Sequence, residues 1–295
     1  MSSYGSLLDA VRRLRWPARR TVSSGATGAH HSRARGSSAE FTEYRPYRQG
    51  DDPRRVDWKL MARSDRAYIR ISTDRAILTT VILADASASM AFPAGSLTKW
   101  VQARRLGVGL AAVAHADGDP VGLAVVAVSG TRELAPRTRR GVVSEVARAL
   151  DETTPAGAAP LAPALAALTH RSSGATRVAI VTDLLGDADE LLAAARRHVA
   201  AGGEVHVVHV VAREELEPPR RALLAVDPEA PELRRPLVDA VRDEYASAFA
   251  RWRDGVAAAW RASGSSYSLV ADDEPSERAV RRIVAGGGAA GAAAS

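Results

Sequence analysis

The sequence predicts an α/β fold with a doubly wound, mostly parallel sheet. Four apolar runs have the length and composition of strands that are buried on both faces. They lie at 77–84, 121–128, 177–182 and 204–211. Segments with helical periodicity separate them or follow them, at 98–116, 140–150, 160–170 and 187–201. Strands that alternate with helices of this length are typical of parallel β-α units.

The first 38 residues are predicted to form a basic, partly flexible segment, 1–38. Leu and Val scattered among arginines at 5–16 predict a short amphipathic helix, and Pro17 ends it. Residues 21–38 are rich in Ser, Gly, Ala and Arg, a composition typical of irregular chain.

Residues 39–75 form a dense charged and aromatic block. Asp52 followed by Pro53 predicts a helix start, because a carboxylate caps free amides and proline fits the first helical position. The helix is expected to run to about Arg63, and alternating apolar residues predict a strand at 67–72. We interpret the block as ion pairs and aromatic side chains that pack on the core. Docking of a partner is the second interpretation.

The core domain is predicted to span 76–284. Apolar and aromatic residues recur every three or four positions at 237–260, which predicts a helix that packs on the sheet. Residues 285–295 are low-complexity Gly and Ala, and we expect a disordered tail. Shorter elements are predicted as strands at 131–134, 222–226 and 267–270 and as a helix at 275–284.

The composition excludes several kinds of site. The chain has no cysteine, which excludes disulfides, zinc thiolates and cysteine nucleophiles. No apolar run approaches the roughly 18–20 residues that cross a bilayer. The N-terminus also lacks the apolar stretch of a signal peptide. We therefore expect a cytoplasmic protein without a membrane span.

Basic residues are concentrated in the first quarter of the chain. Residues 1–75 hold 16 Lys and Arg against 8 Asp and Glu. Acidic side chains such as Glu43, Asp51 and Asp57 are interleaved with the arginines. This pattern favours internal ion pairs or a protein interface over a phosphate-binding stripe. A nucleic-acid-binding protein is therefore the weaker alternative, and we expect no nucleic-acid partner.

A cluster of oxygen-bearing side chains follows the first apolar run. Asp85, Ser87 and Ser89 stand at alternate positions, so a tight loop can direct three oxygens toward one point. Asp183 follows another run, and the carboxyl ends of parallel strands meet at one edge of the sheet, where α/β proteins bind ligands. Hard cations prefer oxygen ligands. The sequence therefore predicts a site for Mg²⁺ or Mn²⁺ formed by Asp85, Ser87, Ser89 and Asp183.

The loop and the later Thr182-Asp183 pair resemble the metal-ion-dependent adhesion site of von Willebrand factor A domains. The upstream block closely resembles bacterial domain-of-unknown-function family 58, and this resemblance covers roughly residues 10–284. It is carried by Glu40-Phe41, Arg45, Tyr47, Gly50-Asp51-Asp52, Arg54, Asp57-Trp58, Ala62-Arg63 and Gly118-Asp119-Pro120-Val121-Gly122-Leu123.

The resemblance implies a von Willebrand factor A-like core and a non-catalytic role. It implies an adaptor or co-chaperone that works with a MoxR-type AAA+ ATPase and a client protein. In such sites, Ser87 and Ser89 would bind the cation directly. Asp85 and Asp183 would act through bound water, and a carboxylate of the partner would fill an open position. Ala159 stands where the resemblance places a threonine ligand, so we expect a degenerate site in which a cation binds weakly, is supported by water or is absent.

A metal-dependent hydrolase that uses Asp85 and Asp183 is the alternative function. Against it, no Gly-x-Ser-x-Gly elbow surrounds Ser87 or Ser89, and the histidines offer no matching base. The sequence also lacks a phosphate-cradling glycine loop, which leaves ATP hydrolysis to a partner.

Overall fold

The computed structural model describes residues 4–18, 41–48, 51, 53, 56–64, 66–72, 78–93, 99–172, 175–218, 224–226, 234–236 and 239–286. The chain divides into two compact units: a main unit, Met1–Arg20 with Ile77–Ser295, and a small unit, Thr21–Ala76. This division differs from the predicted boundary at residue 38. The stretch 21–38 and nearly all of the tail at 285–295 lie outside the described residues.

A six-stranded sheet forms the centre of the main unit. Its strand order is β10-β7-β6-β3-β4-β5, and all neighbours are parallel except the antiparallel pair β4 and β5. In chain order this is the 3-2-1-4-5-6 arrangement of a doubly wound sheet, whose winding reverses between β3 and β6. The predicted class, a doubly wound, mostly parallel α/β sheet, is confirmed. The strands are β3 (Thr79–Asp85), β4 (Val121–Ala127), β5 (Gly130–Arg137), β6 (Thr176–Thr182), β7 (Glu204–Val211) and β10 (Ser266–Ala271).

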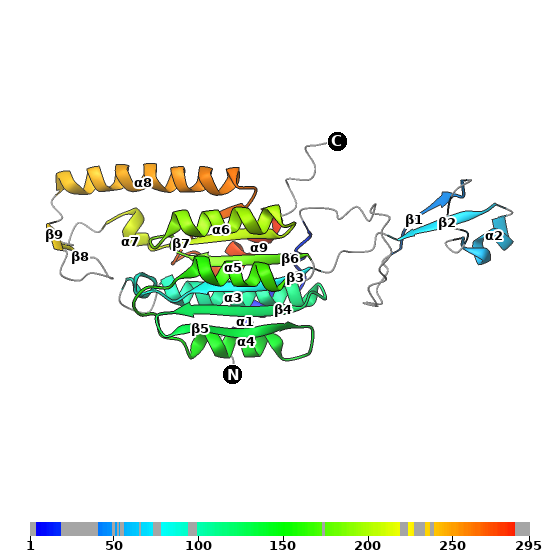
Figure 1. The fold of residues 1–295 in the computed structure, drawn as a ribbon, viewed down its shortest axis with the longest axis horizontal. Coiled ribbons are helices and arrows are strands. Elements are labelled where there is room, and N and C mark those ends of the chain that lie inside the picture. The colour runs from blue at the N-terminus through cyan, green and yellow to red at the C-terminus, as the bar shows by residue number, and fades with distance from the viewer. Residues whose placement is uncertain are drawn as a thin grey trace. The chain divides into compact units, whose positions relative to one another are not determined.

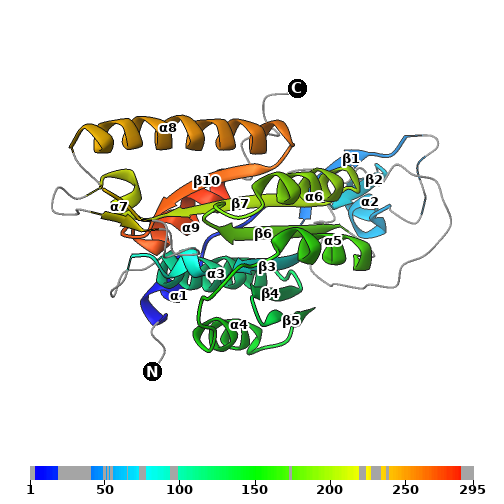
Figure 2. The same ribbon diagram turned by 60° about the vertical axis from the view of Figure 1, so that its left-hand side comes forward.

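Helices cover both faces of the sheet (Figures 1 and 2). Apolar side chains of α1, α3, α4 and α9 share a buried cluster with one face, and those of α5, α6 and α8 share a second cluster with the other. No described helix is long and apolar enough to span a membrane. The helices are α1 (Gly5–Val11), α3 (Lys99–Ala116), α4 (Val142–Asp151), α5 (Leu161–Arg171), α6 (Ala188–Ala200), α7 (Arg213–Leu216), α8 (Asp239–Ala262) and α9 (Ser276–Gly286), with the short 3-10 helix η2 (Ala88–Ala91).

Strand β3 lies in the middle of the sheet and is buried on both faces, as its unbroken apolar sequence predicts. Ile82 and Ala84 belong to the cluster that contains α3, whereas Leu83 belongs to the opposite cluster. Because β4 and β6 both run parallel to β3, the strand brings Asp85 to the edge at which β6 also ends.

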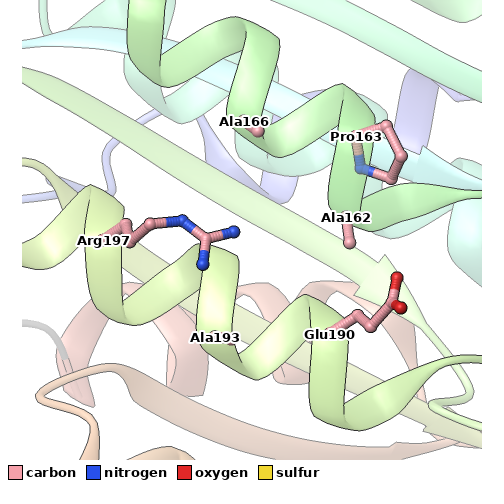
Figure 3. Close-up of a pocket in the computed structure, with 6 residues that line it drawn as sticks. All are labelled: Ala162, Pro163, Ala166, Glu190, Ala193 and Arg197. Atoms are coloured by element: carbon pink, nitrogen blue, oxygen red, sulfur yellow. The ribbon is translucent and has the colours of Figure 1, made fainter.

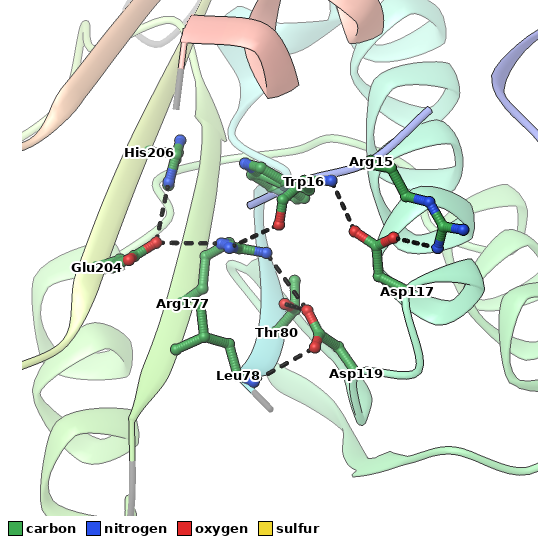
Figure 4. A network of polar contacts seen from close by, with 9 residues as sticks. All are labelled: Arg15, Trp16, Leu78, Thr80, Asp117, Asp119, Arg177, Glu204 and His206. Carbon is green, nitrogen blue, oxygen red and sulfur yellow. Dashed lines mark hydrogen bonds and ion pairs between the residues drawn. The ribbon is translucent and has the colours of Figure 1, made fainter. Parts of the chain in front are cut away.

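Residues 4–18 are built into the main unit, which their basic composition did not indicate. Trp16 is 1% exposed and lies 4.4 Å from the guanidinium of Arg177, at the amino edge of the sheet. Figure 4 shows this buried arginine between Asp119, Glu204 and the backbone carbonyl of Trp16. The first part of the predicted flexible segment is therefore held by a buried cation and a tryptophan ring.

The small unit contains an antiparallel pair of strands, β1 (Phe41–Pro46) and β2 (Tyr68–Ser72), with helix α2 (Trp58–Ser64) between them in sequence. The guanidinium of Arg45 donates to both carboxylate oxygens of Asp51, at 2.8 and 2.7 Å. The internal ion pairing predicted for this block is confirmed at this pair. Packing of the block on the core stays a prediction.

Helix α2 begins later than predicted. The amides of Lys59 and Leu60 each donate to Asp57 Oδ1 at 3.0 Å, so Asp57 is the residue that caps the helix. The predicted start at Asp52 lies outside the described residues.

The long helix α8 packs on the sheet through its aromatic residues, as predicted. Trp260 is 1% exposed, and the ring of Trp252 meets His209 of β7 edge-on at 5.6 Å. Between α7 and α8, the short strands β8 (Leu224–Val226) and β9 (Arg234–Pro236) pair antiparallel.

Candidate functional site

The loop after β3 gathers the three side chains that the sequence singled out. The amide of Ser87 donates to Asp85 Oδ1 at 2.9 Å, a turn that aspartate favours and that folds the loop back on the strand end. The hydroxyl oxygens of Ser87 and Ser89 lie 3.1 Å apart. All three side chains are buried in the described structure, so the loop presents its oxygens inward.

Strand β6 brings a second polar group to the same edge. Thr182 Oγ1 donates to Asp85 Oδ2 at 2.6 Å, and Asp183 follows directly, 1% exposed. The expectation that Asp85 and Asp183 share one edge of the sheet is confirmed by the parallel register of β3 and β6. Both carboxylates are therefore buried within one polar cluster.

The chain turns sharply after Asp183. Leu184 has φ 58°, the only positive φ of a non-glycine residue in the described parts of the chain. Such a conformation costs about 1–2 kcal/mol for a residue with a Cβ. The Leu184 amide donates to Thr182 Oγ1 at 3.0 Å, and the Leu185 amide donates to Asp183 Oδ1 at 3.2 Å. The strained turn thus orients the Asp183 carboxylate into the cluster, as strained backbone often does at functional sites.

A lysine that the sequence did not single out completes the cluster. Lys99 is the first residue of α3, and its Nζ lies 2.7 Å from Asp183 Oδ2 and 2.7 Å from Glu215 Oε1 of α7. The Lys99 and Asp183 side chains are 0% and 2% exposed. Glu215 is held by the Ala212 amide, which donates to its other oxygen at 2.7 Å. Three segments distant in sequence therefore meet at one ammonium group.

Burial raises the pKa of two acidic groups of this cluster, whereas the attraction of opposite charges prevails for its lysine. Burial, and then the charge of Asp183, raises the pKa of Asp85 to about 6. Burial also raises the pKa of Glu215, because it outweighs the attraction of Lys99. For Lys99 itself, burial lowers the pKa, but the charges of Asp183 and Glu215 outweigh it and leave the pKa raised. The ammonium therefore stays charged inside the protein at neutral pH.

The loop in which a threonine ligand was expected does lie against the Asp85 loop. The Ala88 amide donates to the Gly157 carbonyl at 2.8 Å, and the Ala156 amide donates to the Ala86 carbonyl at 3.0 Å. Ala159 follows with a methyl group that packs on the core. The nearby Thr153 hydroxyl donates to the Ala149 carbonyl at 2.8 Å within the end of α4.

The donor set fits a divalent cation only in part. Metal–oxygen bonds of about 2.1 Å at right angles place two ligand oxygens about 3.0 Å apart, and the serine pair has this spacing. Both carboxylate oxygens of Asp183, however, already accept hydrogen bonds, one from the Lys99 ammonium and the other from the Leu185 amide. Within the described ranges, no three Asp, Glu or His side chains are grouped to hold a metal. Asp183, engaged in this way, and Ala159, which has no oxygen in place of the threonine, therefore do not fit such an ion.

Sequence reasoning missed Lys99, Glu215 and Thr182. A signal for the first was present: the chain has only two lysines, Lys59 and Lys99, among its 40 Lys and Arg residues. A rare residue type at the start of an apolar helix can indicate a specific contact. The contact itself, across 84 and 116 residues of sequence, could not be read from local pattern.

Two hollows lie outside this cluster. A groove of about 280 Å³ separates α5 from α6, lined by small side chains with Glu190 and Arg197 on α6 (Figure 3). A larger hollow of about 650 Å³ lies between the start of α6 and α8, beginning at Gly186, and its lining includes Asp187 and Trp252. The second hollow therefore adjoins the turn that carries Asp183.

Comparison with known proteins gives relatives over nearly the whole chain. Uncharacterized protein Rv1480 of Mycobacterium tuberculosis is 27% identical over 284 residues, which are 95% of this chain and 89% of that protein. Uncharacterized protein Mb1516 of Mycobacterium bovis matches to the same extent. The chain spans most of the length of these relatives.

Solved structures with similar chain traces are more distant. The conserved hypothetical protein BatB from Bacteroides thetaiotaomicron has a TM-score of 0.48 and 17% identity, covering 71% of this chain and 98% of that one. The VWA domain of SpRpn10 has a TM-score of 0.40 and 12% identity, covering 71% of this chain and 94% of that one.

The sequence model of one protein family matches residues 43–255, which include both the small unit's α2 and the Asp85 cluster. Because this match extends over well more than half of the chain, the protein belongs to the family described as Protein of unknown function DUF58.

Proposed function

We propose that this chain is a non-catalytic protein-interaction module of the cytoplasm that works as an adaptor or co-chaperone with a MoxR-type AAA+ ATPase. Membership of the family supports the choice of partner, because the motifs that resemble family 58 imply that pairing. The carboxyl edge of the sheet, around the Asp85 cluster, is the proposed contact face.

The observation that carries the proposal is a pair of exposed apolar side chains at that edge. Val128 is 64% exposed and Leu185 is 47% exposed. Leu185 stands two residues after Asp183. Val128 packs closely against Gly157: a Cβ added to Gly157 would lie 2.8 Å from the Val128 side chain. The Gly157 carbonyl in turn accepts a hydrogen bond from Ala88 in the Asp85 loop. Exposed apolar groups that flank one edge favour a protein contact more than scattered ones do.

The hollow that begins at Gly186 extends this face. It combines the ring of Trp252 with the carboxylates of Asp187 and Asp189, next to the exposed Leu185. Aromatic and apolar groups supply most of the affinity at protein interfaces, and charged groups around them supply orientation. The partner segment that fits this chemistry is apolar with basic flanks.

The test is co-purification with the AAA+ ATPase encoded beside this gene, followed by affinity measurements on variants. We expect Leu185→Asp and Val128→Asp to weaken the complex at least about tenfold, which corresponds to about 1.4 kcal/mol. Ala200→Asp is the control, because Ala200 is also exposed but is the last residue of α6, which leads to the opposite, amino edge of the sheet. Failure to detect any complex, or equal weakening by the control, would contradict the proposed face.

The same preparation separates this function from a metal-dependent hydrolase. If the chain turns over a phosphate or carboxylic ester, and Asp85→Ala abolishes that turnover, the non-catalytic assignment is wrong. Loss of partner binding in Asp85→Ala without any turnover in the wild type supports the interaction module.

A further inference from the structure

The cluster at the carboxyl edge already contains a cation that belongs to the chain. Lys99 Nζ lies 2.7 Å from a carboxylate oxygen of Asp183 and 2.7 Å from one of Glu215, and its side chain is 0% exposed. Its own amide donates to the Phe92 carbonyl at 3.0 Å, and its ammonium lies 5.8 Å from the centre of the Phe92 ring. The position of the ammonium is therefore fixed by α3, by the chain after η2 and by two carboxylates.

We propose that Lys99 is the resident cation of this site, that it replaces a divalent metal ion, and that the face is assembled without one. Buried carboxylates need a nearby positive charge, and a divalent ion or an ammonium can supply it. Here the ammonium neutralises the negative charge of Asp183, which would otherwise be available to a metal ion bound at Asp85, Ser87 and Ser89.

The choice of residue supports this role. The chain carries two lysines among 40 Lys and Arg residues, so arginine is its usual cation. Guanidinium is a rigid planar fork, whereas ammonium is a compact point charge with three donors in different directions. The compact ammonium of Lys99 reaches Asp183 after β6 and Glu215 of α7, which approach from different elements.

The bridge also explains how α7 is held. Glu215 is anchored on one side by the Ala212 amide and on the other by Lys99, and the Arg213 amide donates to Asp272 Oδ1 at 2.9 Å. The short helix that follows β7 thus depends on the ammonium for its contact with the end of β6. A metal-free site of this kind is insensitive to chelators, in contrast to an adhesion site that binds its partner through a metal.

The test uses the purified full-length chain after treatment with EDTA, titrated with MnCl₂ and MgCl₂ by calorimetry and followed by thermal unfolding. We expect no binding heat and no shift of Tm for the wild type with either ion at millimolar concentration. Removal of the ammonium in Lys99→Met leaves Asp183 and Glu215 unpaired, so Tm should fall in EDTA. Added Mn²⁺ should then raise the Tm of Lys99→Met by several degrees, because the two carboxylates gain a replacement cation.

Two matched variants make the result specific. Lys99→Met combined with Asp183→Asn should lose the rescue by Mn²⁺, because one of the two carboxylates is gone. Arg104→Met removes a partly exposed cation from the same helix, where it pairs with Asp151, and should show no response to metal. Saturable binding of Mn²⁺ or Mg²⁺ by the wild type would overturn the proposal, and so would a Lys99→Met protein that metal does not stabilise. The wild-type titration decides the matter even if Lys99→Met does not fold.

Discussion

Replacement of Arg177 by Met tests whether the buried network at the amino edge holds the N-terminal segment. The Arg177 side chain is 0% exposed and lies 3.4 Å from Asp119 and 3.3 Å from Glu204. It also donates to the Trp16 carbonyl at 3.0 Å and lies over the Trp16 ring at 4.4 Å. Methionine keeps much of the apolar stem in place and removes the charge.

We expect a large decrease in the free energy of unfolding, because several buried groups lose the same partner. Removing one side of a buried ion pair costs about 3–5 kcal/mol. A desolvated cation–π contact contributes about 2 kcal/mol, and a buried carbonyl left without a donor costs about 1–3 kcal/mol. These contributions overlap, since they share one guanidinium, so we expect a loss of about 5 kcal/mol in the free energy of unfolding. Domains are stable by only about 5–15 kcal/mol.

Urea unfolding followed by tryptophan fluorescence measures this loss, and limited trypsin digestion reports the N-terminal segment directly. Cleavage at Arg12, Arg13 and Arg15 should accelerate in Arg177→Met, because Trp16 loses its anchor. The control is Arg132→Met, which removes an exposed pair with Glu152 and should cost at most about 1 kcal/mol. An Arg177→Met protein that matches this control in stability and in trypsin resistance would refute the reasoning.

Two further predictions concern the core. Burial lowers the pKa of His209 from 6.5 to about 4, so the unfolded chain gains a proton near pH 6.5 that the folded protein takes up only near pH 4. The stability that neutral His209 contributes is complete above pH 6.5 and is lost as the pH falls toward 4. Relative to His209→Phe, wild-type stability measured by urea unfolding should therefore drop by on the order of 3 kcal/mol from about pH 7 to pH 4; a difference that does not change with pH would contradict this. Gly109→Ala places a Cβ 2.8 Å from Val280 Cγ2, where α3 meets α9, and should cost about 1–3 kcal/mol by thermal or urea unfolding. Gly255→Ala on α8, with open space around the new methyl group, is its control and should be neutral or stabilising.

Much of the fold was accessible from local pattern. Apolar runs such as the one ending at Asp85 indicated buried parallel strands, and the helical periodicities between them indicated the covering layers. Helix α2 is capped by Asp57, which the sequence did not single out, because several aspartates of this block are good caps and only the structure shows which one binds the free amides. Strand β1 was not predicted, since its residues alternate weakly and gain their pairing from β2.

The candidate site was predictable in its position and not in its chemistry. Asp85, Ser87 and Ser89 follow one strand and Asp183 follows another, and parallel topology alone brings them to one edge. Lys99 and Glu215 reach that edge from a helix start and from a short helix after β7. Their approach depends on how α3 and α7 pack, and no short-range pattern encodes it.

The sequence by itself determined the strands, the main helices and the edge of the sheet at which polar groups collect, because periodicity and chain direction are local properties. The tertiary structure alone decided which charges meet there. Lys99 neutralises Asp183 across 84 residues, and Arg177 holds Trp16 across 161 residues. Such pairs are fixed by packing, since a buried charge is stable only where distant segments bring it a partner.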